Sequence, residues 1–295
     1  MNLIDIDRLF PTDEECRELL TRLRWPEGVR CPRCSMDAVE LETEKQLFYC
    51  KQCDYQFTVT AGTVFNDSHL PLKTWFLATL LLCEAKKGIS ACQIQRTIGV
   101  SYKTAWYLCH RIRHAMSQAD RPMLSGKVEM DETYIGGFHH GKAGRGSENK
   151  EIVIGIRERG WELRLFHADD LRKGTVQKFV KEHISQDVDI IFTDDLTLYR
   201  GAFADLRKEG RHKTIRRKWH IYVQGDIHTN TIESAFSLLK RGVIGTWHKV
   251  SAKHLAAYLQ EMEFRFNRRK RSDLFLDTLR HMVTSPVLTF EKLTA

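Results

Sequence analysis

The spacing of hydrophobic residues changes near residue 120 and divides the chain into two parts. In the first part, apolar residues recur every three to four positions in 11–24 and again from 70 to about 118, as in amphipathic helices. Gly88 and Gly99 interrupt the second of these stretches. Beyond a turn-rich linker at 121–126 the spacing becomes alternating, as in strands. The pattern therefore predicts a helical front part and a separate domain that is built on a sheet.

The second part contains a regular order of strands and helices. The segments that we interpret as strands are 127–131, 150–157, 161–167 and 188–192. The segments with helical spacing are 173–184, about 196–208 and about 231–241. The second and third strands form a hairpin that turns at Arg159-Gly160. Three strands, a crossover helix and a fourth strand predict an α/β sheet of mixed direction, in which the first and fourth strands are neighbours.

Composition adds a weak preference for a nucleic-acid partner. The formal net charge of +8 favours a polyanion, although basic proteins of many kinds share this balance. No apolar run approaches the roughly 20 residues that a membrane span needs, and the N-terminus lacks a basic-then-apolar signal pattern. We therefore expect a cytosolic protein without a membrane partner. Its eight cysteines are then metal ligands or core residues rather than disulfides.

Four of the cysteines form two close pairs with the spacing of a zinc site. Cys31 and Cys34 are followed after fifteen residues by Cys50 and Cys53, which gives C-x2-C-x15-C-x2-C. Each pair can present two thiolates to one ion, and four thiolates favour tetrahedral zinc without an open position. We therefore predict a structural zinc site, with four unrelated buried cysteines as the alternative. The remaining cysteines lie at apolar positions of helical patterns and are predicted to be core residues: Cys16, Cys83, Cys92 and Cys109.

Residues 88–116 have the pattern of two helices joined by a short turn. Ser90 can begin the first helix, Gly99 can end it, and Ser101 can cap the second. The alternative is a helical hairpin that only packs. The residues that we expect at the exposed start of a recognition helix are Tyr102, Lys103, Thr104 and Tyr107. Farther along, Arg111 and Arg113 are candidates for contacts with DNA phosphates.

Three carboxylates occupy positions from which they could share metal ions. Asp131 ends the first predicted strand of the second part, Asp194 follows the fourth strand, and Glu233 lies in the first turn of a later helix. Neighbouring strands bring both aspartates to one edge, and a helix that crosses this edge can supply the third acid. Three such acids can hold two Mg²⁺ ions roughly 4 Å apart, an arrangement that catalyses in-line phosphoryl transfer.

Each acid also has a simpler interpretation. Asp131 could end a strand in solvent, Asp194 could cap the following helix, and Asn230-x-x-Glu233 fits a capping box. Lys240 favours the metal site, because it lies two helical turns beyond Glu233 on the same face and could meet a phosphate.

Other polar groups are weaker candidates. The acidic pair Asp169-Asp170 follows the third strand and is rejected, because that position should lie away from the first strand's carboxylate. His139, His140 and His167 lack a ligand-like spacing. The runs 211–218 and 265–271 each carry five Lys or Arg residues, and they are either solvated faces or a surface that follows a DNA backbone.

Taken together, these motifs resemble those of bacterial insertion-sequence transposases of the DDE type, in the branch with an N-terminal zinc ribbon. The resemblance covers most of the chain in the family's order. The stretches that carry it are CPRC and CKQC, residues 88–116, MDETYIGG at 130–137, IIFTDD at 190–195, and residues 228–269.

The resemblance implies a multi-domain fold. Its expected parts are an N-terminal helical segment at 1–27, a zinc ribbon at 28–62, an all-α helix-turn-helix region at 68–120, and an α/β ribonuclease-H-like catalytic domain at 126–285. The last of these is a mixed sheet flanked by helices.

The implied activity is Mg²⁺-dependent cleavage and transfer of DNA strands at terminal inverted repeats, with Mn²⁺ as a possible substitute metal. In that family Asp131 and Asp194 would be the paired metal-binding aspartates, Glu233 the third acid and Lys240 its basic partner. The expected partners are double-stranded DNA and further copies of the chain, in a dimer or a larger assembly. The expected location is the bacterial cytoplasm, at the nucleoid. The alternative functions are a DNA-binding regulator with an inactive ribonuclease-H-like domain, and a nuclease that cuts without joining.

Overall fold

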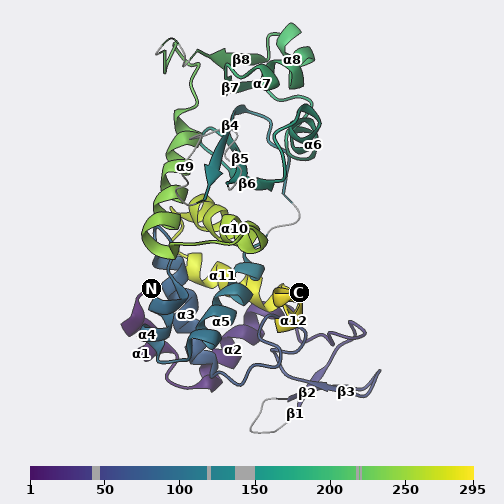
Figure 1. Cartoon of the computed structure of the whole chain (residues 1–295). Coiled ribbons are helices and arrows are strands. Elements are labelled where there is room, and N and C mark those ends of the chain that lie inside the picture. Colours follow the sequence, from purple (N-terminus) through teal and green to yellow (C-terminus); the bar gives the residue numbers. More distant parts are fainter. Residues whose placement is uncertain (42–46, 118–120, 137–149, 217–218, 220) are drawn as a thin grey trace. The chain divides into compact units, whose positions relative to one another are not determined.

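A computed structural model describes the chain except for residues 42–46, 118–120, 137–149, 217–218 and 220. The chain forms two compact units (Figure 1). The first unit combines residues 1–117 with 268–295, and the second contains residues 118–267. His139 and His140 lie outside the described residues.

The first unit begins with two short helices and a small three-stranded sheet. Helices α1 (Leu3–Leu9) and α2 (Asp13–Arg24) each begin with a capping box. Strands β1 (Val39–Leu41), β2 (Leu47–Cys50) and β3 (Tyr55–Phe57) form an antiparallel sheet. Phe48 and Phe57 of this sheet form edge or tilted ring contacts with each other and with Trp25, which follows α2.

The rest of the first unit is helical. Its helices are α3 (Leu72–Glu84), α4 (Ala91–Ile98), α5 (Tyr102–Ala115), α11 (Leu274–Thr284) and α12 (Phe290–Thr294). Ser90 and Ser101 cap α4 and α5 through their side chains, and Gly99 ends α4 with φ of 73°. The predicted bounds of these two helices are therefore confirmed.

Helix α11 belongs to the first unit, whereas the predicted catalytic domain extends to residue 285. Phe275 contacts Phe76 of α3 with ring centroids 5.8 Å apart. The Thr79 hydroxyl lies 3.4 Å from the Met282 sulfur. An amphipathic pattern predicts that a helix buries one face, but it does not identify the core that receives it. The sheet-containing unit therefore ends at residue 267.

The second unit is a five-stranded mixed sheet in the order β6-β5-β4-β7-β8. Its strands are β4 (Lys127–Ile135), β5 (Glu151–Glu158), β6 (Leu163–Ala168), β7 (Ile190–Asp194) and β8 (His212–Ile215). Strands β4, β5 and β6 pair antiparallel, whereas β7 runs parallel to both β4 and β8. The four predicted strands are confirmed, as is the prediction that the first and fourth are neighbours. β8 was missed because its residues lie in a basic run.

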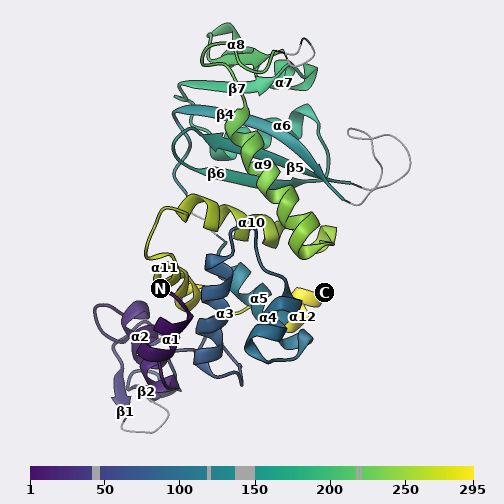
Figure 2. The same cartoon turned by 90° about the vertical axis from the view of Figure 1, so that its left-hand side faces the viewer.

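Helices cover both faces of this sheet. One face packs against α6 (Lys173–His183) and α7 (Thr197–Ala202), which α8 (Ala204–Lys208) follows. The other face packs against α9 (Asn230–Gly242) and α10 (Ala252–Arg268), which a π-helical turn, η2 (Val243–Trp247), connects. Figure 2 shows α9 crossing the sheet. Alternation along β4 directs Val128 and Met130 to the first face and Ile135 to the second.

Candidate functional site

The four paired cysteines come together as the sequence predicts. Their sulfur atoms all lie within 4.8 Å of one another. The Cys31 and Cys53 sulfurs are 3.6 Å apart, and those of Cys34 and Cys50 are 3.5 Å apart. A tetrahedral site with Zn–S bonds of about 2.3 Å has sulfur–sulfur edges of about 3.8 Å. The cluster therefore fits one zinc ion, and it has no place for a water ligand.

The other four cysteines divide differently from the prediction. Cys16, Cys83 and Cys109 are buried, as expected for core residues. Cys92 is exposed on α4, so its assignment to the core was wrong. A single cysteine in a short amphipathic helix can lie at the edge of the apolar face, where the spacing alone does not determine its burial.

Asp131 and Asp194 lie at the same level of two neighbouring parallel strands. The register of β4 and β7 pairs Lys127 with Ile190 and Glu129 with Phe192. Continued by two residues, this register places Asp131 beside Asp194. Adjacent strands are about 4.8 Å apart, and residues at one level of a parallel pair face the same side. Asp131 is 5% exposed and lies in the middle of β4, because this strand continues to Ile135 rather than ending at the aspartate.

Glu233 is brought to this region by the close packing of α9 on the sheet. Asp131 pairs with Gly155 of β5. A Cβ atom at Gly155 would lie only 2.7 Å from side-chain atoms of Ile232 and Phe236. The missing side chain therefore lets the first turns of α9 approach the sheet beside Asp131. Glu233 follows Ile232 directly, and its Oε1 accepts a hydrogen bond of 2.9 Å from the Thr229 hydroxyl.

The interpretation of Asn230 and Glu233 as a capping box is wrong. The N-cap of α9 is Thr229, and no side-chain hydrogen bond closes it. The amides of Thr231 and Ile232 instead donate to Glu129 Oε2 at 2.9 and 3.0 Å. Glu129 was not a predicted site residue. A signal was present, because it lies two residues before Asp131 on the same face of a strand whose neighbouring positions are apolar.

The three acids are spaced more widely than the cysteines. In the described part of the chain, the cysteine cluster alone gathers three or more potential ligand atoms within 4.8 Å of one another. Lys240 lies exposed two turns along α9 from Glu233, which is about 10 Å along the axis.

The rejected acidic pair has a structural role. Asp170 accepts hydrogen bonds from the Thr175 hydroxyl and from the Arg172 amide at the start of α6. The Thr175 hydrogen bond is the largest cause that holds the pKa of Asp170 below its usual value. This pair follows β6, which lies two strands away from β4. His167 binds the Glu151 carboxylate at 2.6 Å.

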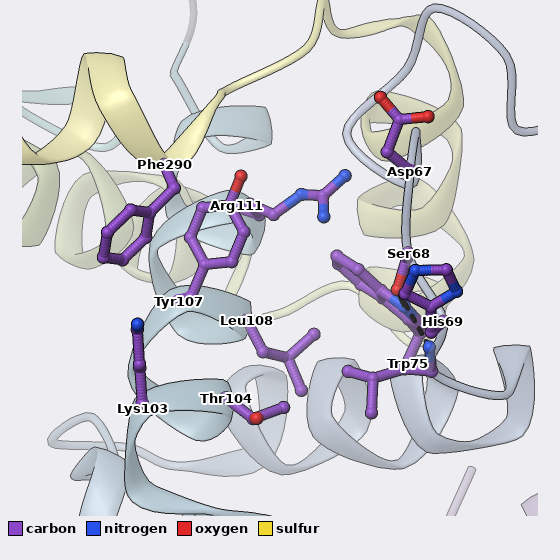
Figure 3. Close-up of a pocket in the computed structure, with 11 residues that line it drawn as sticks. Asp67, Ser68, His69, Trp75, Lys103, Thr104, Tyr107, Leu108, Arg111 and Phe290 are labelled. Atoms are coloured by element: carbon purple, nitrogen blue, oxygen red, sulfur yellow. Dashed lines mark hydrogen bonds between the residues drawn. The ribbon is translucent and has the colours of Figure 1, made fainter.

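The predicted recognition helix presents some of its candidate residues and buries others. Tyr102 is 51% exposed, and Lys103 is exposed as well. Lys103 and Tyr107 both contact Phe290 of α12, and the Tyr107 hydroxyl donates to the Leu288 carbonyl at 2.7 Å. Lys103, Thr104, Tyr107 and Phe290 are among the residues that line a cavity of about 340 Å³. Figure 3 shows their side chains.

Arg111 and Arg113 are buried, at 3% and 1% exposure. The Arg111 guanidinium lies about 5 Å from the rings of Trp75 and Tyr107 and donates to the Asn66 carbonyl. Burial is the main cause that lowers the pKa of Arg111. The Arg111 guanidinium can be buried because aromatic faces and a carbonyl replace water around it. Since both arginines are buried, their positions do not support the predicted phosphate contacts.

The basic run at 265–271 is largely paired within the protein. Arg265 binds Glu261, Arg268 binds Asp277, and Arg271 binds Asp273, each at 3.0 Å or less. In this run the charges therefore stabilise helices more than they form a free surface. In the run at 211–218, residues 212–215 form β8, Arg211 binds Glu209, and 217–218 lie outside the described residues.

Both parts of the chain are similar to known transposase sequences. Residues 123–267 match the family model of the ISXO2-like transposase domain, and residues 11–56 match that of the transposase zinc-ribbon domain. The chain is also 30% identical over 277 residues to an uncharacterized protein in transposable element ISH50 of Halobacterium salinarum. This alignment covers 88% of the chain and 92% of that protein. The first match ends at residue 267, where the sheet-containing unit ends. No described helix is long and apolar enough to cross a membrane.

Proposed function

The chain belongs to the DDE insertion-sequence transposases of the ISXO2-like family that carry a zinc ribbon, and from this premise we propose that Asp131, Asp194 and Glu233 are its catalytic acids. The reaction would be Mg²⁺-dependent cleavage and transfer of DNA strands at the terminal inverted repeats of the element. The observation that carries this proposal is the β4–β7 register, in which Glu129 pairs with Phe192; continued by two residues, it brings Asp131 level with Asp194. The packing of α9 over Gly155 supports the inclusion of Glu233.

The donor set fits Mg²⁺. Carboxylate oxygens are its preferred protein ligands, and it is usually held by few of them together with phosphate oxygens. A pair of such ions would activate a water or a 3′-hydroxyl and stabilise the leaving oxygen at the phosphate. Asp131 would hold an ion together with Asp194 and Glu233, because its strand lies between β7, which carries Asp194, and β5, over which α9 packs.

Other residues of this unit would bind the DNA strand that reacts. Lys240 is exposed on α9, two turns beyond Glu233, and no ion pair involves it within the described residues. Its ammonium group is available to a DNA phosphate near the acids. The sheet order and the positions of the two aspartates favour a ribonuclease-H-like catalytic domain.

The first unit would recognise the ends of the element. Helices α4 and α5 would act as a helix-turn-helix, with Tyr102, Lys103 and Thr104 near base edges. Tyr107 is the fourth candidate, although it already contacts the C-terminal segment. Recognition of two ends and of target DNA favours a dimer or a larger assembly. The zinc ribbon supports this unit as a structural element.

A strand-transfer assay tests the proposal. The intact chain is incubated with Mg²⁺ and labelled DNA that carries the inverted repeats, and is compared with Asp194→Ala and Asp205→Ala. Asp205 is the control, because it is an exposed carboxylate on α8 that pairs with Lys208. We expect joined products from the intact chain and from Asp205→Ala, and none from Asp194→Ala, with DNA binding retained by all three. Binding without cleavage or joining by any of them would favour the regulator with an inactive domain.

A further inference from the structure

Glu129 is a fully buried carboxylate beside the proposed catalytic acids, and the reaction does not use it directly. It lies on β4 two residues before Asp131, so both side chains are on the same face of the sheet. Its exposed fraction is 0%. A buried carboxylate is costly unless charged groups and hydrogen-bond donors surround it, so the partners of Glu129 indicate what it holds in place.

These partners come from one arginine, one histidine and one helix end. Arg159 Nε donates to Glu129 Oε1 at 2.7 Å, and His228 Nδ1 lies 3.2 Å from the same oxygen. The other oxygen, Oε2, accepts the amides of Thr231 and Ile232 at 2.9 and 3.0 Å. Amide groups in the first turn of a helix have no partner within the helix and carry its positive partial charge. Glu129 therefore caps α9 from the sheet, in place of the side-chain cap that Thr229 does not make.

Arg159 extends the same support to the segment that leads into α9. Its Nη1 donates to the Asp226 carbonyl and carboxylate, both at 2.9 Å, and its Nη2 donates to the His228 carbonyl at 2.9 Å. The guanidinium also lies over the Phe192 ring, 4.2 Å from its centroid. The chain that enters α9 is thus attached to β4 and β5 by charged hydrogen bonds.

The cap and the glycine contact constrain the same turn of α9. Glu129 holds the amides of Thr231 and Ile232, and Gly155 admits the Ile232 side chain. Glu233 is the next residue after Ile232, and Asp131 is two residues after Glu129. One strand segment therefore carries both a proposed metal ligand and the anchor of the helix that bears another.

We propose that Glu129 is a positioning residue that sets the location of Glu233 relative to Asp131, and hence the affinity for the metal ion that Glu233 binds. This rests on the proposed function of the acids. Partners of metal ligands typically change metal affinity or activity by roughly 10- to 100-fold when they are replaced. A purely structural role would lower stability without this specific effect.

The test compares Glu129→Gln with Glu263→Gln in the full, zinc-loaded chain. Glu263 is a matched control: it is 3% exposed, binds Arg121 at 2.6 Å and accepts the Leu165 amide, yet its partners do not include α9. Mn²⁺ binding is measured by electron paramagnetic resonance, and amide hydrogen exchange is measured in the first turn of α9. The same titration is repeated with Glu233→Gln and with the double variant Glu129→Gln/Glu233→Gln.

We expect Glu129→Gln to weaken the binding of one Mn²⁺ ion roughly 10- to 100-fold. Amide exchange at Thr231 and Ile232 should accelerate by roughly 10-fold or more, since these amides lose a charged acceptor. Glu263→Gln should lower the melting temperature without either effect. The double variant should bind Mn²⁺ no more weakly than Glu233→Gln.

Independent, multiplying losses in the double variant would overturn the proposal, and so would unchanged exchange in Glu129→Gln or equal effects of Glu263→Gln. If Asp194→Asn bound as much Mn²⁺ as the unsubstituted chain, or if neither bound any, the proposed function of the acids would be contradicted. The exchange rates would then still decide, against the Glu263 control, whether Glu129 holds the first turn of α9.

Discussion

The cysteine cluster and the three acids are two metal-binding candidates built in opposite ways. The cysteines come from two short knuckles within residues 31–53, and their sulfurs lie within 4.8 Å of one another. The acids lie on two strands and a helix between residues 131 and 233, and packing of the whole second unit brings them to one region. The cluster is complete by itself, as a structural site should be. The three acids are not gathered within that distance, and the proposal is that they share metal ions with a DNA phosphate.

The largest effect on folding is expected at the cysteine cluster, whose ligands are close together in the sequence. Cys50→Ser removes one thiolate of a closed site in a three-stranded sheet whose strands are only three or four residues long. Structural zinc sites bind with about 10–16 kcal/mol at neutral pH, which exceeds the stability of many domains. We expect loss of zinc, measured by metal analysis, and exchange of the amides of β2 and β3 at unfolded rates.

Cys92→Ser is the control for this change, because Cys92 is exposed and lies outside the cluster. It should keep a full complement of zinc. Retention of zinc by Cys50→Ser would contradict a site that requires four thiolates, and slow exchange after loss of zinc would show that the sheet does not depend on the metal.

The relative positions of the three acids should depend on the packing of α9 against the sheet, because the acids are far apart in the sequence. Gly155→Ala places a methyl group against Ile232 and Phe236. Overpacking of this kind costs about 1–3 kcal/mol, and the displaced α9 would carry Glu233 away from Asp131. We expect a lower melting temperature by calorimetry and a loss of strand transfer larger than the loss of folded protein.

Gly174→Ala is the matched substitution, because nothing lies within 4 Å of the added atom and the residue is helical. It should leave strand transfer intact and stabilise α6 by up to about 1 kcal/mol. A Gly155→Ala variant with normal activity would remove the close approach of α9 from the description of the site.

A smaller effect is expected from pH at the strand next to Asp194. His212 of β8 contacts the Thr193 hydroxyl at 3.0 Å, and its Nδ1 is buried without a partner among the described residues. Burial, and then the charge of Arg207, lower the pKa of His212 to about 4. The unfolded chain, with a His pKa of about 6.5, takes up this proton first, so stability should fall as the pH decreases from about 6.5 towards 4.

Linkage gives a loss of about 2 kcal/mol at pH 5 relative to pH 7 for such a histidine. His212→Gln keeps a donor for Thr193 but cannot titrate, and it should flatten the dependence of the unfolding free energy on pH over this range. An unchanged slope in denaturant unfolding at pH 7, 6 and 5 would contradict the assignment of this acid sensitivity to His212.

Sequence patterns predicted correctly those features that depend on residues close together in the sequence. The cysteine spacing, the serine caps of α4 and α5, and the glycine that ends α4 are all local, and the structure has them as predicted. The neighbouring positions of β4 and β7 also followed, because the order of elements restricts the sheet topology.

Features that depend on distant partners were missed or misread. β8 is a short edge strand in a basic run, and its pairing with β7 has no local signal. Arg111 reads as a DNA contact until Trp75 and Tyr107 are placed around it. The sequence pattern suggests Glu233 as a helix cap, but the amides at the start of α9 bind Glu129, which lies more than a hundred positions away.

The most direct measurement replaces a proposed metal ligand by a softer one. Asp194→Cys changes a carboxylate to a thiolate, which binds Mg²⁺ poorly and Mn²⁺ better. If Asp194 binds a catalytic ion, DNA strand cleavage by this variant should be lost in Mg²⁺ and partly restored in Mn²⁺, while Asp194→Ala stays inactive in both. Equal activity of Asp194→Cys in the two metals, with DNA binding retained, would contradict a metal-binding role for Asp194 and with it the two-metal site.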